Sequence, residues 1–269
     1  MDIKIFSCFH KPFKIPNSDV IYPIHVGKAN SSIHMDMITD YDGDNISVKN
    51  NNYCELTAVY WAWKNIKCDI IGLTHYRRYF ELSSSRYEVK IEDDSILDSK
   101  VFEKYKCKIE NTFLSGYDII MAKPIVFDTS VRNQYINSHI REDIEILESV
   151  IKKKYPNYMK SYDYIMNKQN KISAYNMFIM NKIEFDKYCE WLFSILFEVE
   201  NKVNISEYPY QARIFGFMSE RLLNVYVYHN KLKVKYNSII FIDNKLKSKK
   251  NYRIKQKLRN IRNNIKFRV

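Results

Sequence analysis

The chain has 269 residues, of which 43 are Lys or Arg and 31 are Asp or Glu, and its net charge at pH 7 is +12. This length suits one large domain with or without an appendage, and five Gly and six Pro are too few for long flexible linkers. No run approaches the roughly 18 apolar residues that span a bilayer, and the five cysteines form no CxxC pair, so we expect a cytoplasmic protein without a disulfide framework.

Apolar runs bounded by polar clusters predict strands, and they lie at Ile3–Cys8, Val20–Val26, Asp69–Leu73, Tyr117–Met121, Asn176–Met180 and Leu232–Ile242. Helical patterns fall between them, at Tyr53–Lys67, Ile96–Leu114, Arg132–Lys154, Lys182–Glu200 and Tyr208–His229. This alternation predicts an α/β fold with a mainly parallel sheet flanked by helices.

The end of the chain has a different composition. Residues 244–269 hold eleven Lys or Arg and no Asp or Glu, so almost all of the net charge lies there. Ile254, Leu258, Ile261 and Ile265 share one helical stripe, which predicts a basic amphipathic helix on an anionic membrane surface. A solvated helix or a disordered tail is the alternative. We therefore divide the chain into 1–243 and 244–269, and we expect no nucleic-acid partner because the nearly neutral body lacks a basic face.

One predicted strand ends in a run of basic residues. Asp69–Leu73 is followed by Thr74 and then by His75, Tyr76, Arg77 and Arg78. Ligands of α/β sheets bind at the carboxyl ends of strands, and arginine matches phosphate oxygens with two parallel hydrogen bonds. These four residues therefore predict a site for an anionic, phosphorylated ligand.

Two further segments are expected to join this site. His10 and Lys11 follow the first predicted strand and are candidates for the same phosphates, although a basic pair before a proline turn is also common on surfaces. Glu55 lies inside an otherwise apolar helix, and a buried carboxylate needs a partner. We expect Glu55 to pair with Arg77 or Arg78 and to orient them.

An acidic loop offers a competing site. Residues 40–44 (DYDGD) contain an Asp-x-Asp, which is the metal-binding signature of many nucleotide-sugar transferases, and its oxygens suit Mg²⁺ or Mn²⁺. The loop does not follow a hydrophobic strand, and acidic residues around Gly are ordinary turn formers. In GT-A glycosyltransferases the Asp-x-Asp stands where this chain has its basic run. We therefore expect cations to replace the metal, with Mn²⁺ or Mg²⁺ bound by Asp40, Asp42 or Asp44 as the alternative.

Five blocks resemble the DUF4422 family, whose members are associated with bacterial capsule, exopolysaccharide and O-antigen synthesis. The blocks are Asp44–Asn50 (DNISVKN), Cys54–Asn65 (CELTAVYWAWKN), Ile71–Phe80 (IGLTHYRRYF), Asn176–Met180 (NMFIM) and Arg213–Leu222 (RIFGFMSERL). The resemblance implies a glycosyltransferase with a variant GT-A fold, and members include galactofuranosyltransferases that use a UDP-linked donor. It covers nearly the whole body, but the basic tail lies outside it.

Asp44, Asn45, Ser47 and Lys49 in the first block are candidate donor contacts. The first three offer hydrogen bonds to sugar or ribose hydroxyls, and Lys49 offers charge to phosphate. Capping of the following helix is the alternative reading of this segment.

Candidates for acceptor activation come from two helices. Tyr135, His139 and Asp143 are four residues apart and would share one helix face, so His139 with Asp143 as its orienting partner is a candidate general base. An ordinary surface His–Asp pair explains the spacing equally well. Glu220 is the second candidate base.

The remaining candidates are basic or belong to the strand at residues 176–180. Arg213 or Arg221 is expected to clamp the diphosphate, with a structural Glu220–Arg221 ion pair as the alternative. Asn176 and Met177 are expected to contact the sugar, although Met177 alone is typical of a core.

Together these features predict an enzyme that moves a hexosyl group from a UDP-sugar to a lipid-linked glycan at the inner face of the cell membrane. We expect inversion at the sugar carbon and no required metal cofactor. A non-catalytic glycan- or polyanion-binding protein is the rival from another class.

Overall fold

The structure is a computed structural model that describes residues 1–83, 88–245 and 249–268. The strands are β1 (Ile3–Phe9), β2 (Ile21–His25), β3 (Ile38–Thr39), β4 (Ile70–His75), β5 (Arg78–Glu81), β6 (Val89–Glu92), β7 (Ile119–Ala122), β8 (Ile125–Val126), β9 (Lys171–Ile172), β10 (Phe178–Asn181) and β11 (Val234–Ile242). The helices are α1 (Asn50–Tyr53), α2 (Leu56–Asn65), α3 (Lys100–Glu103), α4 (Tyr105–Leu114), α5 (Val131–Ser138), α6 (Arg141–Lys154), α7 (Met159–Asn167), α8 (Lys182–Glu200), α9 (Ile214–His229) and α10 (Lys249–Arg268).

The centre of the fold is a nine-stranded sheet with the order β10-β7-β11-β5-β4-β1-β2-β3, in which β6 pairs with β11 and β10 also pairs with β4. Five of its pairings are parallel, namely β1–β2, β1–β4, β2–β3, β6–β11 and β7–β11. Four are antiparallel, namely β4–β10, β7–β10, β5–β11 and β4–β5. The α/β class is confirmed, but the sheet is mixed rather than mainly parallel, because β5 and β10 run against their neighbours.

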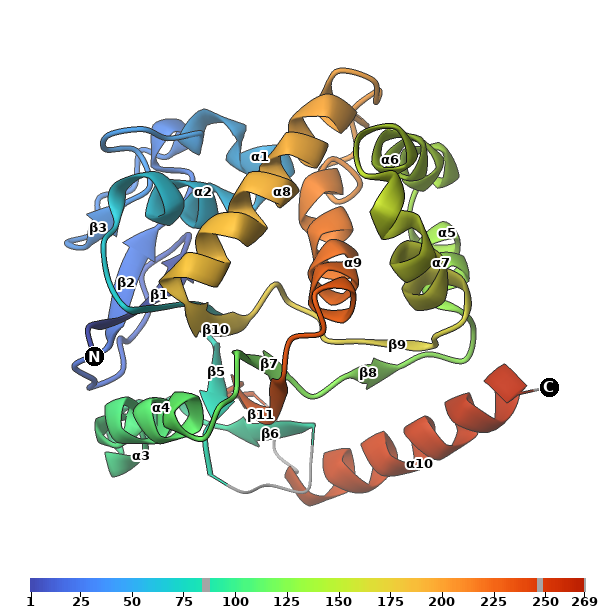
Figure 1. Ribbon diagram of the computed structural model, residues 1–269. Helices are drawn as coiled ribbons and strands as arrows, with labels where there is room; N and C mark the ends of the chain where they lie inside the picture. Colours follow the sequence, from blue (N-terminus) through green and yellow to red (C-terminus); the bar gives the residue numbers. More distant parts are fainter. Residues whose placement is uncertain (84–87, 246–248, 269) are drawn as a thin grey trace.

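Both faces of the sheet are covered, as Figure 1 shows. Side chains alternate across a strand, so in β7 Ile119 and Met121 face the core formed with α1, α2 and α5–α9, whereas Ile120 and Ala122 face the core formed with α3 and α4. Burial on both faces explains why the central strands read as continuous apolar runs.

Gly72 sets the approach of β10 to β4. A Cβ atom at this position would lie 2.8 Å from Ile179 Cγ1 and 2.9 Å from the Phe178 carbonyl oxygen, both shorter than a van der Waals contact. Glycine therefore lets the two strands pair closely, and the pairing brings the residues that precede β10 next to the end of β4.

The predicted helices differ from the observed ones mainly in their interruptions. Lys182–Glu200 is α8 as predicted, but the segment Arg132–Lys154 is split into α5 and α6, with an extended break at His139. The helix predicted to begin at Tyr208 begins at Ile214, after an irregular segment. The strands β5 and β6 and the helix α7 were not predicted.

The C-terminal helix α10 lies along the edge of the molecule, beside β6 and β8 (Figure 1). In the structure this basic segment is helical over Lys249–Arg268, and the side chain of Ile254 lies outside the described residues. Among the described helices, none combines the length and the apolar composition needed to cross a bilayer. The division at residue 243 stays a prediction.

Candidate active site

The basic run at the end of β4 forms a tight hairpin. His75 pairs with Arg78, so Tyr76 and Arg77 make the turn between β4 and β5. Tyr76 is buried, and its ring packs edge-on against His10, with 5.1 Å between the ring centroids. The hairpin therefore joins the ends of β1 and β4, as the sequence predicted for these two segments.

Basic side chains gather around two aromatic rings at this hairpin. Lys11 Nζ lies 5.9 Å and Arg77 Cζ 5.2 Å from the centroid of the Tyr76 ring, and Arg78 Cζ lies 4.9 Å from that of Tyr175. The negative face of an aromatic ring attracts such cations, which holds their aliphatic stems in place without neutralising them.

Charges from several parts of the chain affect the pKa of His10. Burial lowers its pKa, and Lys11, Arg77, Arg213 and His75 lower it further. These residues come from distant segments, so the tertiary structure brings them within electrostatic range of one another. Because its pKa is lowered, His10 is neutral at pH 7 and offers a ligand a hydrogen bond rather than a charge.

We call Lys11, Arg77, Arg78 and Arg213 the cationic cluster. Within residues 1–83, 88–245 and 249–268, none of the four forms a salt bridge with a carboxylate. Arg213 Nε donates to Cys54 Sγ at 3.2 Å, and the buried Nε of Arg77 has no hydrogen-bond partner among the described residues. Like charges held together disfavour one another, so an anion bound here would remove a repulsion.

His75 connects the hairpin to the segment before β10. Its Nε2 lies 2.7 Å from the Tyr175 carbonyl oxygen, and since that oxygen can only accept, Nε2 carries the hydrogen. Burial lowers the pKa of His75, while the carboxylate of Glu55 acts in the opposite direction. His75 is therefore neutral at pH 7, with its tautomer fixed by the backbone.

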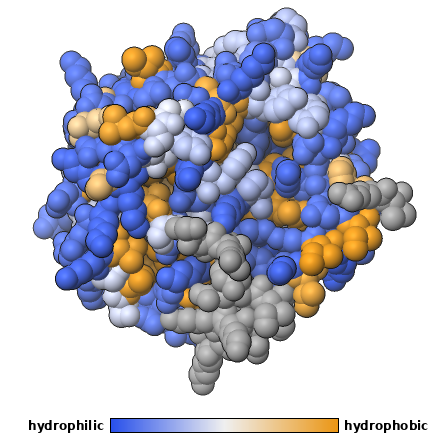
Figure 2. All heavy atoms as spheres, turned by 60° about the horizontal axis from the view of Figure 1, so that its bottom comes forward, coloured by the Kyte–Doolittle hydropathy of each residue, from blue (hydrophilic) through white to orange (hydrophobic). Residues whose placement is uncertain are grey.

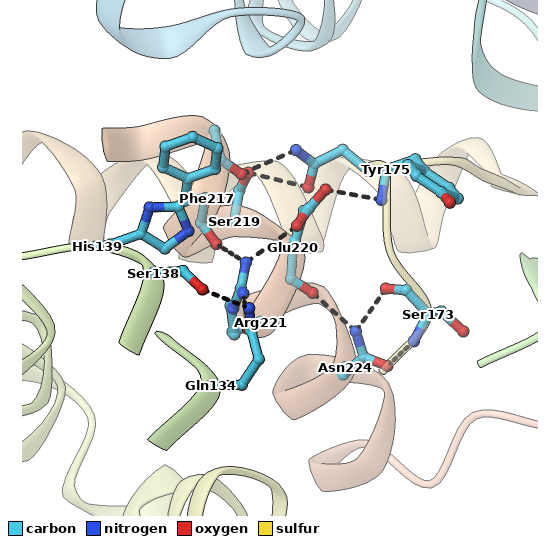
Figure 3. Close-up of polar contacts among 12 residues, drawn as sticks. Gln134, Ser138, His139, Ser173, Tyr175, Phe217, Ser219, Glu220, Arg221 and Asn224 are labelled. Atoms are coloured by element: carbon cyan, nitrogen blue, oxygen red, sulfur yellow. Dashed lines mark hydrogen bonds and ion pairs between the residues drawn. The ribbon is translucent and has the colours of Figure 1, made fainter. Parts of the chain in front are cut away.

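The turn at Tyr175 and Asn176 donates hydrogen bonds to the carboxylates of Glu55 and Glu220. Both residues have positive φ, 73° and 52°, a conformation that costs a non-glycine residue about 1 kcal/mol. The Tyr175 backbone N–H donates to Glu220 Oε1 at 2.8 Å, the Asn176 side-chain amide donates to Glu55 Oε1 at 2.6 Å, and Ser219 Oγ donates to Asn176 Oδ1 at 2.9 Å. Figure 3 shows the hydrogen bond between the Tyr175 backbone nitrogen and the Glu220 carboxylate.

Two predictions for this region are wrong. Glu55 was expected to pair with Arg77 or Arg78, but its hydrogen-bond partner is Asn176, because the β4–β10 pairing delivers the Asn176 turn to the start of α2. Met177 was expected to contact the sugar, but it is fully buried in the core beneath the sheet.

Glu220 and Arg221 form an ion pair of 3.0 Å at the middle of α9. The Arg221 side chain is 4% exposed and also donates to the Phe217 carbonyl oxygen and to Gln134 Oε1 (Figure 3). The Glu220 side chain keeps 20% exposure, and burial raises its pKa while Arg221 opposes that rise. Arg221 therefore has a structural role instead of clamping a diphosphate, whereas Glu220 is an accessible carboxylate with raised proton affinity.

His139 lies at the end of α5 in an extended conformation. Its Nδ1 is 3.2 Å from Gln211 Oε1, and its ring stacks on Phe217 with 4.0 Å between the centroids. Figure 3 shows the rings of His139 and Phe217 next to each other. Burial, assisted by the charge of Arg221, lowers its pKa to about 4. At neutral pH the imidazole is unprotonated but too weakly basic to match the pH at which a general base works best.

Tyr135, His139 and Asp143 do not share a helix face, because α5 ends before His139 and α6 begins after it. Among the described residues, Asp143 makes no hydrogen bond with His139, so its predicted orienting role is wrong. Burial, with a smaller contribution from Glu142, raises the pKa of Asp143 to about 6. The Tyr135 hydroxyl is buried without a hydrogen-bond partner in the described chain, and burial raises its pKa.

Hydrogen bonds connect the acidic loop to the body of the protein. Asp40 is fully buried and accepts hydrogen bonds from the backbone N–H groups of Gly27 at 2.7 Å and Lys28 at 3.1 Å, and from Ser47 Oγ at 2.5 Å. Within the described residues, no group of three or more His, Cys, Asp or Glu is arranged to hold a metal. Asp40 therefore has a structural role, while the metal requirement stays a prediction.

The other predicted donor contacts of this loop also have internal partners. Asn45 Nδ2 donates to two carbonyl oxygens of its own turn, Asp44 Oδ1 accepts from the Tyr60 hydroxyl at 3.2 Å, and Lys49 Nζ pairs with Glu200 at 2.6 Å. The buried Ser47 donates to Asp40, as described above. The structure favours a scaffolding role for these four residues over donor contact.

Sequence reasoning missed Tyr175, Gln211 and Phe217. Tyr175 acts through its backbone in a positive-φ turn, which a tyrosine does not signal because glycine and, less strongly, asparagine favour that conformation. Gln211 and Phe217 approach His139 because α9 begins late and because α5 ends early, and neither event has a strong sequence signature.

Comparison with known proteins connects this site to a family. Residues 4–231 match the family described as a domain of unknown function, DUF4422. The chain is also similar to the apo structure of the WbbM bifunctional glycosyltransferase, with a TM-score of 0.80 and 31% sequence identity. That match covers 91% of this chain and 46% of the WbbM chain, so the chain spans less than half of that protein. No curated protein matches.

The family match contains the hairpin, the Tyr175–Asn176 turn and Glu220, and it covers most of the chain. This confirms the resemblance read from the five sequence blocks. The chain belongs to the DUF4422 family.

Proposed function

We propose that this chain is a glycosyltransferase that moves a hexosyl group from a UDP-sugar to a glycan acceptor. The observation that carries the proposal is the cationic cluster, in which Lys11, Arg77 and Arg78 lie over aromatic rings at one hairpin and Arg213 lies within electrostatic range of His10, with no carboxylate salt bridge to any of the four within the described residues. The likeness to the WbbM glycosyltransferase supports the reaction class, and it supports a variant GT-A fold for residues 1–243.

In this proposal the cationic cluster holds the diphosphate of the donor, and the neutral His10 and His75 assist. When the bond between the anomeric carbon and the diphosphate oxygen breaks, negative charge grows on the departing UDP. Fixed cations placed where that charge develops stabilise the transition state, which is the task that an Asp-x-Asp-bound metal performs in other transferases. The proposal therefore needs no metal at the acidic loop.

We assign deprotonation of the acceptor to Glu220. A general base must be accessible and works best when its pKa lies near the working pH; Glu220 is partly exposed, and burial moves its pKa upward in that direction. Its carboxylate would take the proton of the acceptor hydroxyl as that oxygen attacks the anomeric carbon, which gives inversion. Burial lowers the pKa of His139 to about 4, which makes it the weaker candidate.

The acceptor in this proposal is a lipid-linked glycan of capsule, exopolysaccharide or O-antigen synthesis, at the inner face of the cell membrane, and the hexosyl group is galactofuranosyl or another galactosyl group. These assignments rest on the family resemblance. The hydroxyls of a glycan suit a carboxylate base and an exposed aromatic ring such as Tyr210, which packs against Phe217 of α9 with 5.2 Å between the ring centroids.

The test is release of UDP from a panel of UDP-sugars that includes both ring forms of galactose, with EDTA or Mn²⁺ present. Turnover of one donor in EDTA would support both the transferase and the cationic cluster as the replacement for a metal. Turnover only with Mn²⁺ would move the diphosphate site to the acidic loop. Ligand binding without UDP release, even with glycan acceptors present, would favour a non-catalytic binding protein.

A further inference from the structure

The C-terminal helix α10 docks on the protein through polar side chains. Gln256 and Asn263 are the buried residues of its described part. Asn263 Nδ2 donates to the Val126 carbonyl oxygen at 2.9 Å, and Asn264 Oδ1 accepts from Asn170 Nδ2 at 3.2 Å. Asn260 adds a contact to Glu88 near β6. These contacts come from successive turns of one helix face, so they fix the rotation of α10 about its own axis.

Three apolar side chains in the described part of α10 consequently point away from the protein. Leu258, Ile261 and Ile265 are 61%, 50% and 60% exposed, and their spacing of three and four residues places them on one face. A surface helix of a globular protein normally has the opposite arrangement, with its apolar face toward the core. Figure 2 shows hydrophobic surface among hydrophilic side chains on the side of the molecule that carries α10.

Positive charge surrounds this apolar stripe. Residues 249–268 contain nine Lys or Arg and no Asp or Glu, and Lys257, Arg259, Arg262 and Lys266 are exposed in the described part. Lys266 approaches Asp128 at 3.8 Å, but both side chains are more than half exposed, so the pair neutralises little of the charge.

We propose that α10 is a preformed membrane-binding helix whose outward stripe of Leu258, Ile261 and Ile265 enters an anionic lipid surface while its Lys and Arg contact the headgroups. The combination of an exposed apolar face and a cationic surround is what an interfacial helix requires. A second copy of the chain is a poorer occupant, because it would bring two such basic helices together. Nucleic acid would use the charge but leave the apolar stripe in water.

The hydrogen bonds of the docked polar face fix the orientation of α10, which the sequence pattern alone does not. A free basic tail must form its helix and choose its orientation on the membrane, whereas α10 is already oriented by Asn260, Asn263 and Asn264. The face of the protein that carries β6 and β8 would then lie toward the lipid. This inference goes beyond the proposed catalytic function and does not depend on it.

The test is co-sedimentation of the full chain with vesicles of phosphatidylcholine alone or mixed with phosphatidylglycerol. We expect binding to the mixed vesicles, at least tenfold weaker binding to phosphatidylcholine alone, and release near 1 M salt, where the Debye length is about 3 Å. The triple variant Leu258→Ser, Ile261→Ser, Ile265→Ser should lose at least about tenfold in partitioning, because less apolar area is buried.

The control is the double variant Leu114→Ser, Ile183→Ser, which removes apolar side chains that are 73% and 72% exposed on other helices and should bind as the unaltered chain does. Circular dichroism and UDP release on a soluble acceptor report whether each variant is folded, and a failure of the transferase proposal would leave the vesicle result unaffected. Equal binding by the triple variant and the unaltered chain would overturn the inference. So would a solution dimer of the unaltered chain that the triple variant loses, since a second copy would then cover the stripe.

Discussion

Two regions of this protein contain the residue types that bind phosphate or metal. In only one of them are these side chains available to a ligand. At the hairpin between β4 and β5, the cationic cluster has no carboxylate salt bridge within the described chain. In the acidic loop and the segment that follows it, Asp40 accepts three hydrogen bonds and Lys49 is paired with Glu200. Residue type therefore suggests where a ligand could bind. The region whose charged side chains lack internal partners is the better candidate site, since groups that already form hydrogen bonds or salt bridges must give one up before they bind a ligand.

The largest expected effect is a difference in kcat/KM between variants of the two regions. Arg77→Ala should lower kcat/KM for UDP release about 10²- to 10³-fold, because it removes a fixed donor from the departing diphosphate. Lys49→Ala is the matched control and should leave kcat/KM within about threefold, since its partly exposed salt bridge contributes at most about 1 kcal/mol to stability. Equal losses in the two variants would contradict the distinction between the regions.

The base assignment is tested next. Glu220→Gln should lower kcat about 10²-fold or more and remove the acidic limb of the pH profile of kcat/KM, which should lie above the ordinary glutamate pKa of about 4.3 because burial raises the pKa of Glu220. His139→Phe keeps the ring stack on Phe217 and should retain that limb. A pH profile that flattens in His139→Phe and persists in Glu220→Gln would reverse the two roles.

A smaller effect concerns the stability of the acidic loop. Asp40→Asn should lower the free energy of unfolding by about 1–3 kcal/mol, because an amide cannot accept all three hydrogen bonds. The exposed Asp42→Asn should change it by less than about 0.5 kcal/mol. Denaturant titration measures both. An Asp40→Asn protein of unchanged stability that loses activation by Mn²⁺ would instead identify a metal site.

The last expected effect has the opposite sign and concerns Asp143, whose pKa burial raises to about 6. The folded protein binds its proton more tightly than the unfolded chain does, so this group lowers stability as the pH rises from about 4 to about 6. Asp143→Asn should therefore raise the free energy of unfolding at pH 7 by about 3 kcal/mol, with no gain near pH 4 and unchanged turnover. A large loss of turnover would restore a role beside His139.

Much of the fold was readable because its patterns are local. Strand β4 and helix α8 were predicted because apolar runs and three- and four-residue spacing report burial directly. The break in Arg132–Lys154 was not, since two amphipathic helices in succession look like one. Tyr135, His139 and Asp143 were predicted to share one helix face. That single break separates them, because residues four apart share a face only within one helix.

The sequence by itself determined the residues of the candidate site. The HYRRYF block places a His and two Arg at the end of a strand, the five blocks identify the family, and the composition of residues 249–268 specifies a basic helix. These properties depend on residue order alone.

Only the tertiary structure decided which of these residues are available. The close approach of β10 to β4 at Gly72 delivers Asn176 to Glu55, the body of the protein supplies partners for Asp40 and Lys49, and the docking of Asn263 turns the apolar stripe of α10 outward. Each outcome depends on contacts between segments far apart in the sequence, and the energy of a buried polar group is set by such partners rather than by its own identity.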